Sequence, residues 1–216
     1  MKIRLIFLLL ALGSIQTFSQ VKDDKEVKRK RAVELNNKAV KTIFSAGKRD
    51  DLFRQAIQLL DSAIKLDPKV TASYQNKIQD LIALDRYSEA ISAANASLAI
   101  KQDVGILIYK GILLEKTGQI RLAKKTYKKV ESIFTKFYNA HPALGPLERV
   151  AIAKFLVSDR TDALTYFEKE ATKFVYSSSE KDRDKIKTEL STITKDMLLG
   201  KNPTIYIHAP KNPNLL

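Results

Sequence analysis

Small and apolar residues recur at intervals of three and four in two stretches of the chain that share one pattern. The first is LFRQAIQLLDSAIKLDP at residues 52–68 and the second is RYSEAISAANASLAIKQ at residues 86–102, with Ala56 and Ala90 in matching positions 34 residues apart. These intervals place the recurring residues on one face of a helix. Each stretch is therefore predicted to be an amphipathic helix, and its small residues allow a neighbouring helix to approach closely.

A second apolar stripe precedes the second of these helices. Tyr74, Ile78, Leu81 and Ile82 share one helical face, and Asp85 lies where the chain must turn between the two helices. The predicted unit is a helical hairpin of about 34 residues. A single hairpin cannot bury both of its faces, whereas stacked hairpins can, and this explains why the pattern is repeated.

The repeated hairpin resembles the tetratricopeptide repeat (TPR), as found in exported bacterial TPR-containing proteins. The matching residues are Phe53, Ala56, Leu60, Ala63 and Pro68 in the first unit, Tyr74, Tyr87, Ala90, Ala94 and Ser97 in the second, Gly111, Gly118, Ala123, Tyr127 and Val130 in the third, and Leu147, Ala151, Phe155, Ala163 and Phe167 in the fourth. The chain departs from the pattern because it has no Trp, because Ile78 stands where Gly or Ala is usual, and because Lys48 to Asp51 form an insertion. The resemblance implies an all-α fold, a right-handed α-solenoid of TPR helical hairpins.

The ends of the predicted array are closed by single helices. Ser179 and Asp182 form a capping box at the start of an apolar stripe that contains Ile186, Leu190, Ile193 and Met197, which predicts a C-terminal capping helix. A helix from Glu26 to Ala46 is expected to close the other end, with its inward residues at Ala32, Leu35, Ala39, Ile43 and Phe44. The predicted segments are a basic segment at 20–31, the array at 32–174 with repeats at 32–68, 71–102, 104–138 and 144–174, the capping helix at 177–200, and an extended tail at 201–216.

The third and fourth repeats are separated by a longer interval than the others. Ala123 and Ala163 are 40 residues apart, so the helix that contains Ala123 is expected to continue through Ile133, Phe134 and Phe137. The segment HPALGP at residues 141–146 then ends it, because proline cannot continue a helix.

The tail contains Pro210 and Pro213, which exclude a helix there. Two interpretations are open. The tail is a loosely ordered terminus, or Ile205, Tyr206 and Ile207 fold into a groove of this molecule or of a neighbouring one.

The first residues have the layout of a secretory signal peptide. Lys2 and Arg4 precede an apolar run that begins at Leu5, and small and polar residues follow it. The run is interrupted too early for a spanning helix, which needs about 20 apolar residues, so an uncleaved anchor is the weaker alternative. We expect residues 1–19 to be removed before Gln20 and the protein to be exported, either to the periplasm or out of the cell.

The chain is basic, with 38 Lys and Arg residues against 24 Asp and Glu residues and a net charge of +14. Part of this charge is concentrated in two clusters, which are Lys28, Arg29, Lys30 and Arg31, and Lys124, Lys125, Lys128 and Lys129. Such clusters favour anionic partners through long-range attraction, although solvated helix faces that keep a protein soluble have the same composition.

The sequence offers little material for chemistry. There is no Cys, and the two histidines, His141 and His208, are far apart, so a metal site is not expected. No phosphate-binding glycine loop is present. We therefore predict a protein that is not an enzyme, with no cofactor, no metal and no small-molecule substrate.

The resemblance to TPR proteins implies a partner-binding groove lined by the first helix of each hairpin. Carried over position by position, the expected groove residues are Gln75, Gln79, Ile82, Ile108, Tyr109, Ile112, Arg149, Ile152 and Phe155, with Glu115 and Glu148 beside them. An apolar floor with a polar rim suits a partner helix or an apolar peptide. The competing interpretation is that these residues pack against neighbouring helices or against the tail.

Two functions are compatible with these patterns. The leading hypothesis is an exported, non-enzymatic TPR scaffold that binds another protein in its groove. The alternative is a basic-surface binder of an anionic envelope polymer, a membrane surface or a nucleic acid, whose binding would weaken steeply as the salt concentration rises.

Overall fold

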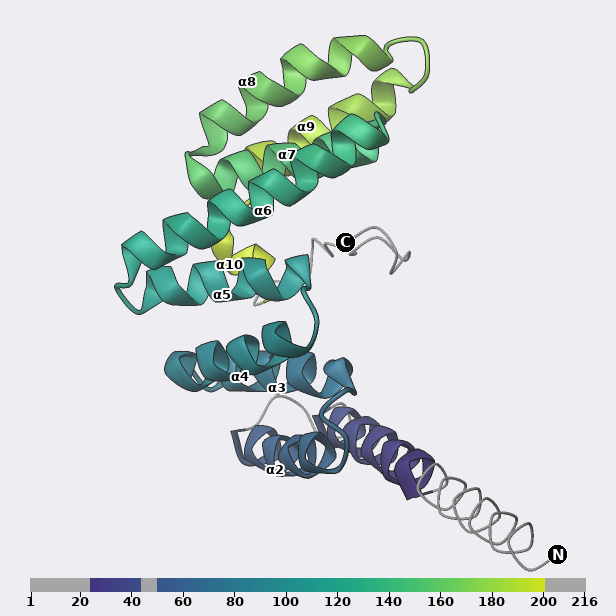
Figure 1. Ribbon diagram of the computed structural model, residues 1–216. Coiled ribbons are helices and arrows are strands. Elements are labelled where there is room, and N and C mark those ends of the chain that lie inside the picture. The colour runs from purple at the N-terminus through teal and green to yellow at the C-terminus, as the bar shows by residue number, and fades with distance from the viewer. Residues whose placement is uncertain (1–23, 44–49, 201–216) are drawn as a thin grey trace, which may run out of the picture. The chain divides into compact units, whose positions relative to one another are not determined.

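The computed structural model describes residues 24–43 and 50–200, which are drawn as ribbons in Figure 1. The chain divides into two compact units, Met1–Asp80 and Leu81–Leu216. The predicted signal peptide, the residue Phe44 and the predicted tail lie outside the described residues. All regular elements of the described residues are helices, so the all-α prediction is confirmed.

The first unit contains a helix over residues 24–43, α2 (Asp50–Leu66) and most of α3 (Thr71–Ala83). Its core is small and tightly packed, because Ala39, Ala56 and Leu60 are completely buried and Ile43 and Leu59 pack against them. The predicted inward residues Ala32 and Ala39 are buried. The small positions of the repeat therefore lie where two helices approach each other, as the pattern predicted.

The second unit continues with a series of helices that pack in chain order. These are α4 (Tyr87–Ile100), α5 (Val104–Lys116), α6 (Ile120–Ala140), α7 (Leu144–Val157) and α8 (Arg160–Ala171), followed by the short 3₁₀ helix η1 (Thr172–Phe174), α9 (Glu180–Thr192) and α10 (Lys195–Leu198). Within this unit α4 packs on α5, α5 on α6, α6 on α7 and α7 on α8 (Figure 1). This serial packing of hairpins is that of the predicted α-solenoid class.

Two hairpin turns use left-handed backbone conformations at matching places. Asp85 has a φ of 55° between α3 and α4, and Gly118 has a φ of 76° between α5 and α6. Glycine adopts this conformation without a steric penalty and aspartate tolerates it better than most residues do. Both predicted turn positions are confirmed.

The crossing of α5 and α6 depends on Gly111. A Cβ atom at this position would lie 2.3 Å from Cε1 of Tyr127 and 2.7 Å from its Cδ1, which is too close for any real contact. The Tyr127 ring therefore occupies the space that a side chain at position 111 would need. This is the small position that the sequence assigned to the third repeat.

The long helix before the proline-rich break is also confirmed. α6 has 21 residues and ends at Ala140, with Phe134 and Tyr138 buried in its last turns. α7 begins at Leu144 and contains Pro146 in its first turn, where the missing N–H of proline costs no intrahelical hydrogen bond.

The C-terminal helix differs from the prediction. The predicted N-cap is present, since the Asp182 N–H donates to Ser179 Oγ at 3.1 Å. Asp182 Oδ2 accepts from the Ser179 hydroxyl at 2.6 Å, whereas in a full capping box it would accept from the Ser179 backbone N–H. The single helix predicted over residues 177–200 is wrong, because Ile193 and Thr194 are extended and divide it into α9 and α10. The Arg160 guanidinium donates to the carbonyl of Ile193 at 2.8 Å, and Thr194 caps α10 by accepting from the Met197 N–H at 3.2 Å. These side chains pair the backbone groups that an uninterrupted helix would have paired internally.

Candidate functional site

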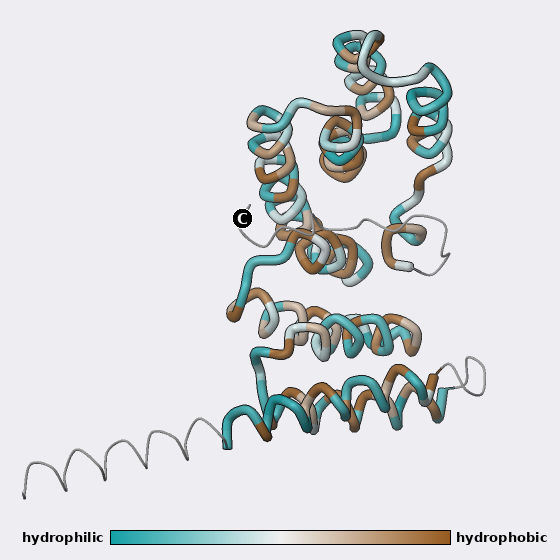
Figure 2. Tube along the Cα trace, turned by 90° about the vertical axis from the view of Figure 1, so that its right-hand side faces the viewer, coloured by the Kyte–Doolittle hydropathy of each residue, from teal (hydrophilic) through white to brown (hydrophobic). Residues whose placement is uncertain are grey.

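The helices α5 and α7 are buried on nearly all sides, and hydrophobic residues run along most of their length (Figure 2). The buried residues are Val104, Ile106, Leu107, Ile108, Gly111, Ile112, Leu113 and Leu114 in α5, and Leu147, Val150, Ala151, Ile152, Ala153 and Leu156 in α7. A helix at the surface of a protein keeps one polar stripe toward the solvent. A further layer must therefore cover the side of α5 and α7 that a two-layer solenoid would leave open.

The C-terminal segment forms this layer. α9 packs on α7 and α8, and α10 packs on α5 (Figure 1). Ile186 and Leu190 of α9, Ile193 between the helices, and Leu198 and Leu199 at the end of α10 are all buried. Their burial stabilises the segment by about 1.5–3 kcal/mol for each large aliphatic side chain.

Charged groups attach α10 to the end of α5. Lys195 Nζ donates to both carboxylate oxygens of Glu115, at 2.7 Å and 2.6 Å, and Lys116 Nζ lies 2.7 Å from Asp196 Oδ1. Lys195 Nζ also lies 5.3 Å from the centre of the Tyr127 ring, whose hydroxyl donates to Glu115 at 2.7 Å. Two ion pairs of opposite polarity therefore fix α10 at one place on α5.

The groups around Glu115 determine the pKa of its carboxyl. Burial by itself would raise the pKa of its carboxyl, but the hydrogen bonds from Lys195 and Tyr127 and the positive charges of Lys195 and Lys116 outweigh burial and lower the pKa. Burial and the neighbouring Glu115 both raise the pKa of Tyr127. Glu115 therefore stays charged and Tyr127 stays protonated around neutral pH, as the hydrogen bond between them requires.

The position of α10 coincides with the predicted groove. Ile108, Ile112 and Glu115 are spaced by four and three residues, so they share one face of α5. Because Glu115 binds Lys195 of α10, α10 lies on that face. Ile108 and Ile112 are each only 1% exposed, so the prediction that they form an open groove floor is wrong.

The same holds for α7. Glu148, Ile152 and Phe155 share a face, and the pKa of Glu148 is raised by burial and then by the negative charge of Glu189 of α9, against the opposing effect of Arg149 and Lys185. α9 therefore lies along this face, and Ile152 is 4% exposed. We call the surface formed by Ile108, Ile112, Glu115, Glu148, Ile152 and Phe155 the inner face.

The other predicted groove residues have different surroundings. Ile82 is buried, and Tyr109, Arg149 and Phe155 are partly buried. Gln75 and Gln79 are exposed on α3 and belong to the first unit, whereas the inner face belongs to the second.

The residues that the sequence analysis missed are Lys195, Asp196 and Lys116. Glu115 had been placed beside the groove by its position in the repeat, but a lysine and an aspartate near the chain's end carry no pattern that connects them to a helix 80 residues earlier. Only the tertiary fold brings them together.

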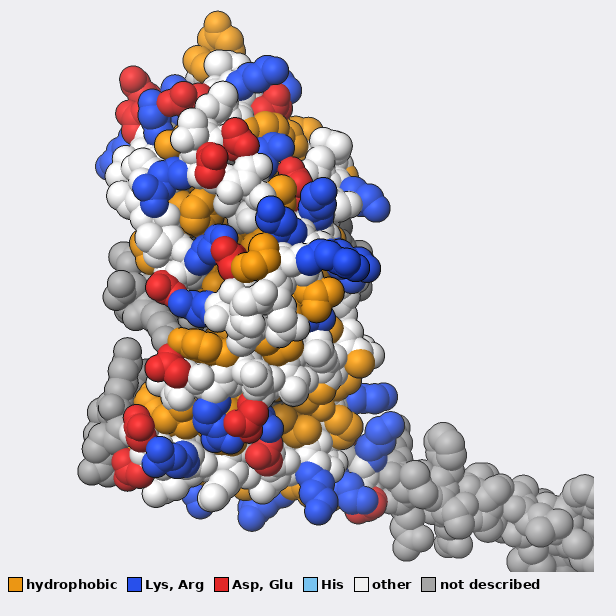
Figure 3. All heavy atoms as spheres, turned by 90° about the vertical axis from the view of Figure 1, so that its left-hand side faces the viewer, with side chains coloured by type: hydrophobic (Ala, Val, Ile, Leu, Met, Phe, Trp, Pro, Cys, Tyr) orange, Lys and Arg blue, Asp and Glu red, His pale blue; other side chains and the backbone are white. Residues whose placement is uncertain are grey.

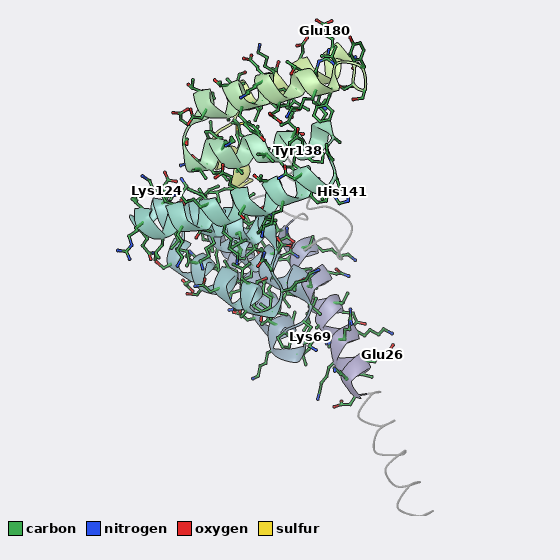
Figure 4. All side chains as sticks on the ribbon, turned by 45° about the horizontal axis from the view of Figure 1, so that its top comes forward. Glu26, Lys69, Lys124, Tyr138, His141 and Glu180 are labelled. Atoms are coloured by element: carbon green, nitrogen blue, oxygen red, sulfur yellow. The ribbon has the colours of Figure 1, made fainter. Side chains whose placement is uncertain are left out.

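The two predicted basic clusters lie in different units. In the first unit, Lys28 pairs with Asp24 at 2.7 Å and Arg31 pairs with Glu34 at 3.3 Å, so this cluster is partly neutralised. In the second unit, Lys124, Lys125, Lys128 and Lys129 are exposed on α6. Figure 4 shows Lys124 near the start of that helix.

The first unit contains a buried polar stripe on α3. The Asn76 side chain donates to Asn36 Oδ1 at 2.8 Å, whereas Ser73 Oγ and Asp80 Oδ2 are buried and have no hydrogen-bond partner among the described residues. Burial raises the pKa of Asp80 to about 7. This stripe was not predictable from the sequence, because polar residues at 73, 76 and 80 also fit an exposed helix face.

Residues 24–43 and 50–200 contain neither a metal-binding cluster nor a membrane-spanning helix. No group of three or more His, Asp or Glu side chains there is placed to hold a metal ion. No helix in that part of the chain is both long and apolar enough to cross a membrane.

No protein-family model and no curated protein sequence matches the chain. Among solved structures it is similar to YrrB, described as a TPR protein with an unusual peptide-binding site, at 14% sequence identity and a TM-score of 0.38, over 72% of this chain and 85% of that one. It is also similar to PilW, described as a widely conserved type IV pilus biogenesis factor, at 18% identity and a TM-score of 0.40, over 83% of this chain and 87% of that one.

The fold class follows from the chain's own hairpins. Helix pairs of the expected length, turns at Asp85 and Gly118, and a small residue at the crossing of α5 and α6 are the features of a TPR-like α-solenoid fold. In the second unit, the inner side of these hairpins is occupied by the chain's own C-terminal segment.

Proposed function

We propose that the protein is an exported, non-enzymatic TPR scaffold that binds another protein, as a peptide or a helix, on the inner face. The observation that carries the proposal is the docking of α10, a short helical segment held there by apolar burial and by two ion pairs. The inner face thus accepts a helical peptide of this chain, and a partner segment of the same chemistry would use the same contacts.

The contacts specify the chemistry of the partner. Ile193 and Leu198 supply buried apolar anchors, Lys195 supplies a cation for Glu115, and Asp196 supplies an anion for Lys116. A matching partner segment is amphipathic, with adjacent cationic and anionic residues between two aliphatic anchors. Such a segment recognises a helix-lined surface by the helix-in-groove mode.

The partner must compete with the segment already present. A tethered segment has an effective concentration in the millimolar range, so an external peptide binds weakly until α10 is released. The scaffold is therefore expected to bind its partner by exchange for α10. Export is supported by the pattern of residues 1–19, which is that of a signal peptide.

A peptide-binding experiment tests the proposal. A fluorescent peptide of residues 190–202 is titrated with three full-length chains, which are the wild type, the double variant Ile193→Asp/Leu198→Asp, and the control Ser191→Asp/Thr192→Asp. The first double variant replaces buried anchors, whereas the control adds the same charge at exposed positions. We expect the anchor variant to bind the peptide at least about tenfold more tightly than the wild type and the control, because its own segment no longer occupies the inner face.

A second peptide checks the specificity of that binding. The same peptide with Lys195→Glu should bind the anchor variant about tenfold more weakly, because its charge opposes Glu115. Circular dichroism confirms that the three chains keep the same helical signal. Failure of the anchor variant to bind the wild-type peptide, with its helical signal intact, would contradict the proposal.

A further inference from the structure

The outward side of α6 carries an unusual concentration of positive charge. Its members lie on the side opposite the buried residues Ala123, Tyr127 and Val130, and all are exposed. We call the set the α6 basic face, and it consists of Arg121, Lys124, Lys125, Lys128, Lys129 and Lys136. It extends for about 22 Å along the helix, at 1.5 Å for each residue. Figure 3 views the molecule from the side at which α6 begins, and Lys and Arg side chains gather there beside hydrophobic ones.

None of these six side chains forms an ion pair with a described residue. Elsewhere in the described chain basic side chains are often paired, as Lys77 is with Asp61 and Lys187 with Glu168. The one acidic residue of α6, Glu131, is engaged by Lys154 of α7 at 3.1 Å. The positive charge of the α6 basic face is therefore not neutralised by the described part of the protein.

This arrangement is unfavourable for the helix itself. Five pairs within the set are spaced by three or four residues, and like charges at these spacings repel each other on a helix. Arg121 also lies in the first turn, where the helix dipole disfavours a cation, and that turn contains no acidic residue. A face that served only solubility would intersperse acidic residues among the lysines. A stripe of unpaired cations is instead suited to an external anion.

Apolar side chains next to the α6 basic face indicate which kind of anion it binds. Ile120 is 47% exposed and Leu122 is 49% exposed, and both lie in the first turn of α6. Because they are two residues apart, they border the α6 basic face on its two sides. Aliphatic side chains exposed at the edge of a basic surface can enter the boundary between headgroups and acyl chains of a lipid bilayer while the lysines bind its phosphates. The phosphate backbone of a nucleic acid offers no apolar site for them. The aromatic residues of α6 do not provide a stacking surface for bases either, because Tyr127, Phe134 and Tyr138 are buried and Phe137 stacks on His141.

We propose that the α6 basic face binds an anionic lipid bilayer, with the six cations at the headgroup phosphates and Ile120 and Leu122 inserted at the level of the first acyl carbons. This activity is independent of the inner face, because it uses the opposite side of α6 from the one that packs against α5 and α7. It would hold the scaffold at a membrane surface while the inner face remains available for exchange.

Vesicle co-sedimentation tests the proposal. The chain beginning at Gln20, which retains every described residue, and the full chain are each mixed with vesicles of phosphatidylcholine alone or of phosphatidylcholine and phosphatidylglycerol at a ratio of three to one. We expect at least tenfold stronger partitioning onto the anionic vesicles, and a loss of this difference as sodium chloride is raised from 50 to 500 mM. Inorganic phosphate at matched ionic strength should displace the protein no better than sodium chloride does, which distinguishes a bilayer from free phosphate.

A charge-matched pair of variants locates the binding surface. The variant Lys124→Glu/Lys125→Glu/Lys128→Glu/Lys129→Glu should partition at least tenfold less onto anionic vesicles. The control Lys65→Glu/Lys69→Glu/Lys101→Glu/Lys181→Glu changes the net charge by the same amount at exposed positions elsewhere and should stay within threefold of the wild type. Equal losses in both variants would show that net charge alone drives binding and would overturn the proposal.

Two further measurements complete the test. Ile120→Ser/Leu122→Ser should weaken binding to anionic vesicles severalfold while the helical signal is unchanged, and unchanged binding would overturn the insertion of these side chains. A labelled DNA duplex should be bound more weakly than anionic vesicles at the same salt concentration. Tighter binding of the duplex would overturn the lipid assignment in favour of a nucleic acid.

Discussion

Gly111 shows how a single residue sets the distance between two helices. The Tyr127 ring fills the space beside it, and the Tyr127 hydroxyl then reaches Glu115 in the next turn of α5. The absence of a side chain at position 111 thus allows both the close approach of α5 and α6 and the hydrogen bond that orients Glu115 toward α10.

Replacing Gly111 by Ala should therefore destabilise the protein by about 1–3 kcal/mol, because the added methyl group overlaps the Tyr127 ring. Gly145→Ala is the matched control, since its Cβ would meet no atom within 4 Å, and it should leave stability unchanged or raise it by up to about 1 kcal/mol. Urea denaturation followed by circular dichroism measures both. Equal effects of the two substitutions would contradict the role assigned to the Tyr127 contact.

The protonation of Asp80 is determined by its buried surroundings. Its side chain is buried, one carboxyl oxygen has no hydrogen-bond partner within residues 24–43 and 50–200, and burial raises its pKa to about 7. The folded chain therefore holds a proton on Asp80 in a pH range where the unfolded chain has released it.

The consequence is a stability that depends on pH. Since the folded-state pKa is raised, the contribution of Asp80 to the free energy of unfolding is complete below pH 4 and is lost as the pH rises to about 7. Over this range the free energy of unfolding falls with a slope on the order of 1 kcal/mol for each pH unit. Asp80→Asn should remove this slope, whereas Asp184→Asn, at an exposed position of α9, should keep it. Urea midpoints between pH 4 and pH 8 test the prediction, and parallel curves for wild type and Asp80→Asn would refute it.

At the level of elements, the C-terminal segment determines whether the inner face is open. A continuous helix through residues 177–200 would carry its apolar stripe in one direction, away from α5. The extended residues Ile193 and Thr194 change that direction, so α9 lies on α7 and α10 lies on α5. The break was not predictable from the stripe, because it is stabilised by Arg160, which belongs to another helix.

The attachment of α10 should depend on the charge of Glu115. Because hydrogen bonds from Lys195 and Tyr127 lower the pKa of Glu115, the docked state keeps its charge below the ordinary glutamate pKa of 4.5. Docking should thus be constant from pH 8 to pH 5 and weaken only at more acidic pH, as the carboxylate becomes protonated.

Glu115→Gln should weaken docking at neutral pH by about 1 kcal/mol, which corresponds to roughly fivefold faster amide hydrogen exchange at residues 193–199. Glu180→Gln, at the exposed start of α9, is the control and should leave exchange there unchanged. Protection that is the same in Glu115→Gln and in wild type would show that apolar burial alone holds α10.

At the level of the whole molecule, the helical hairpins depend on local sequence signals, whereas the contacts on the inner face depend on residues far apart in the sequence. The helices from α2 to α8 were predictable because the periodic small and apolar residues of each repeat are buried within its own unit, and the signals for this are local. The long α6, the turn at Asp85 and the N-cap at Ser179 were predictable for the same reason.

The sequence by itself determined that the protein is a series of helical hairpins, which residues point into their cores, and that α6 is rich in lysine. The tertiary structure alone decided that the inner face is covered and that Lys195 meets Glu115. It also decided that the cations of α6 form no ion pair with a described residue, while those elsewhere in the described chain are often paired. Amphipathic periodicity predicts that a helix face is buried, but it does not predict which segment covers that face. That choice depends on contacts between residues up to 80 positions apart, for which a single sequence contains no signal.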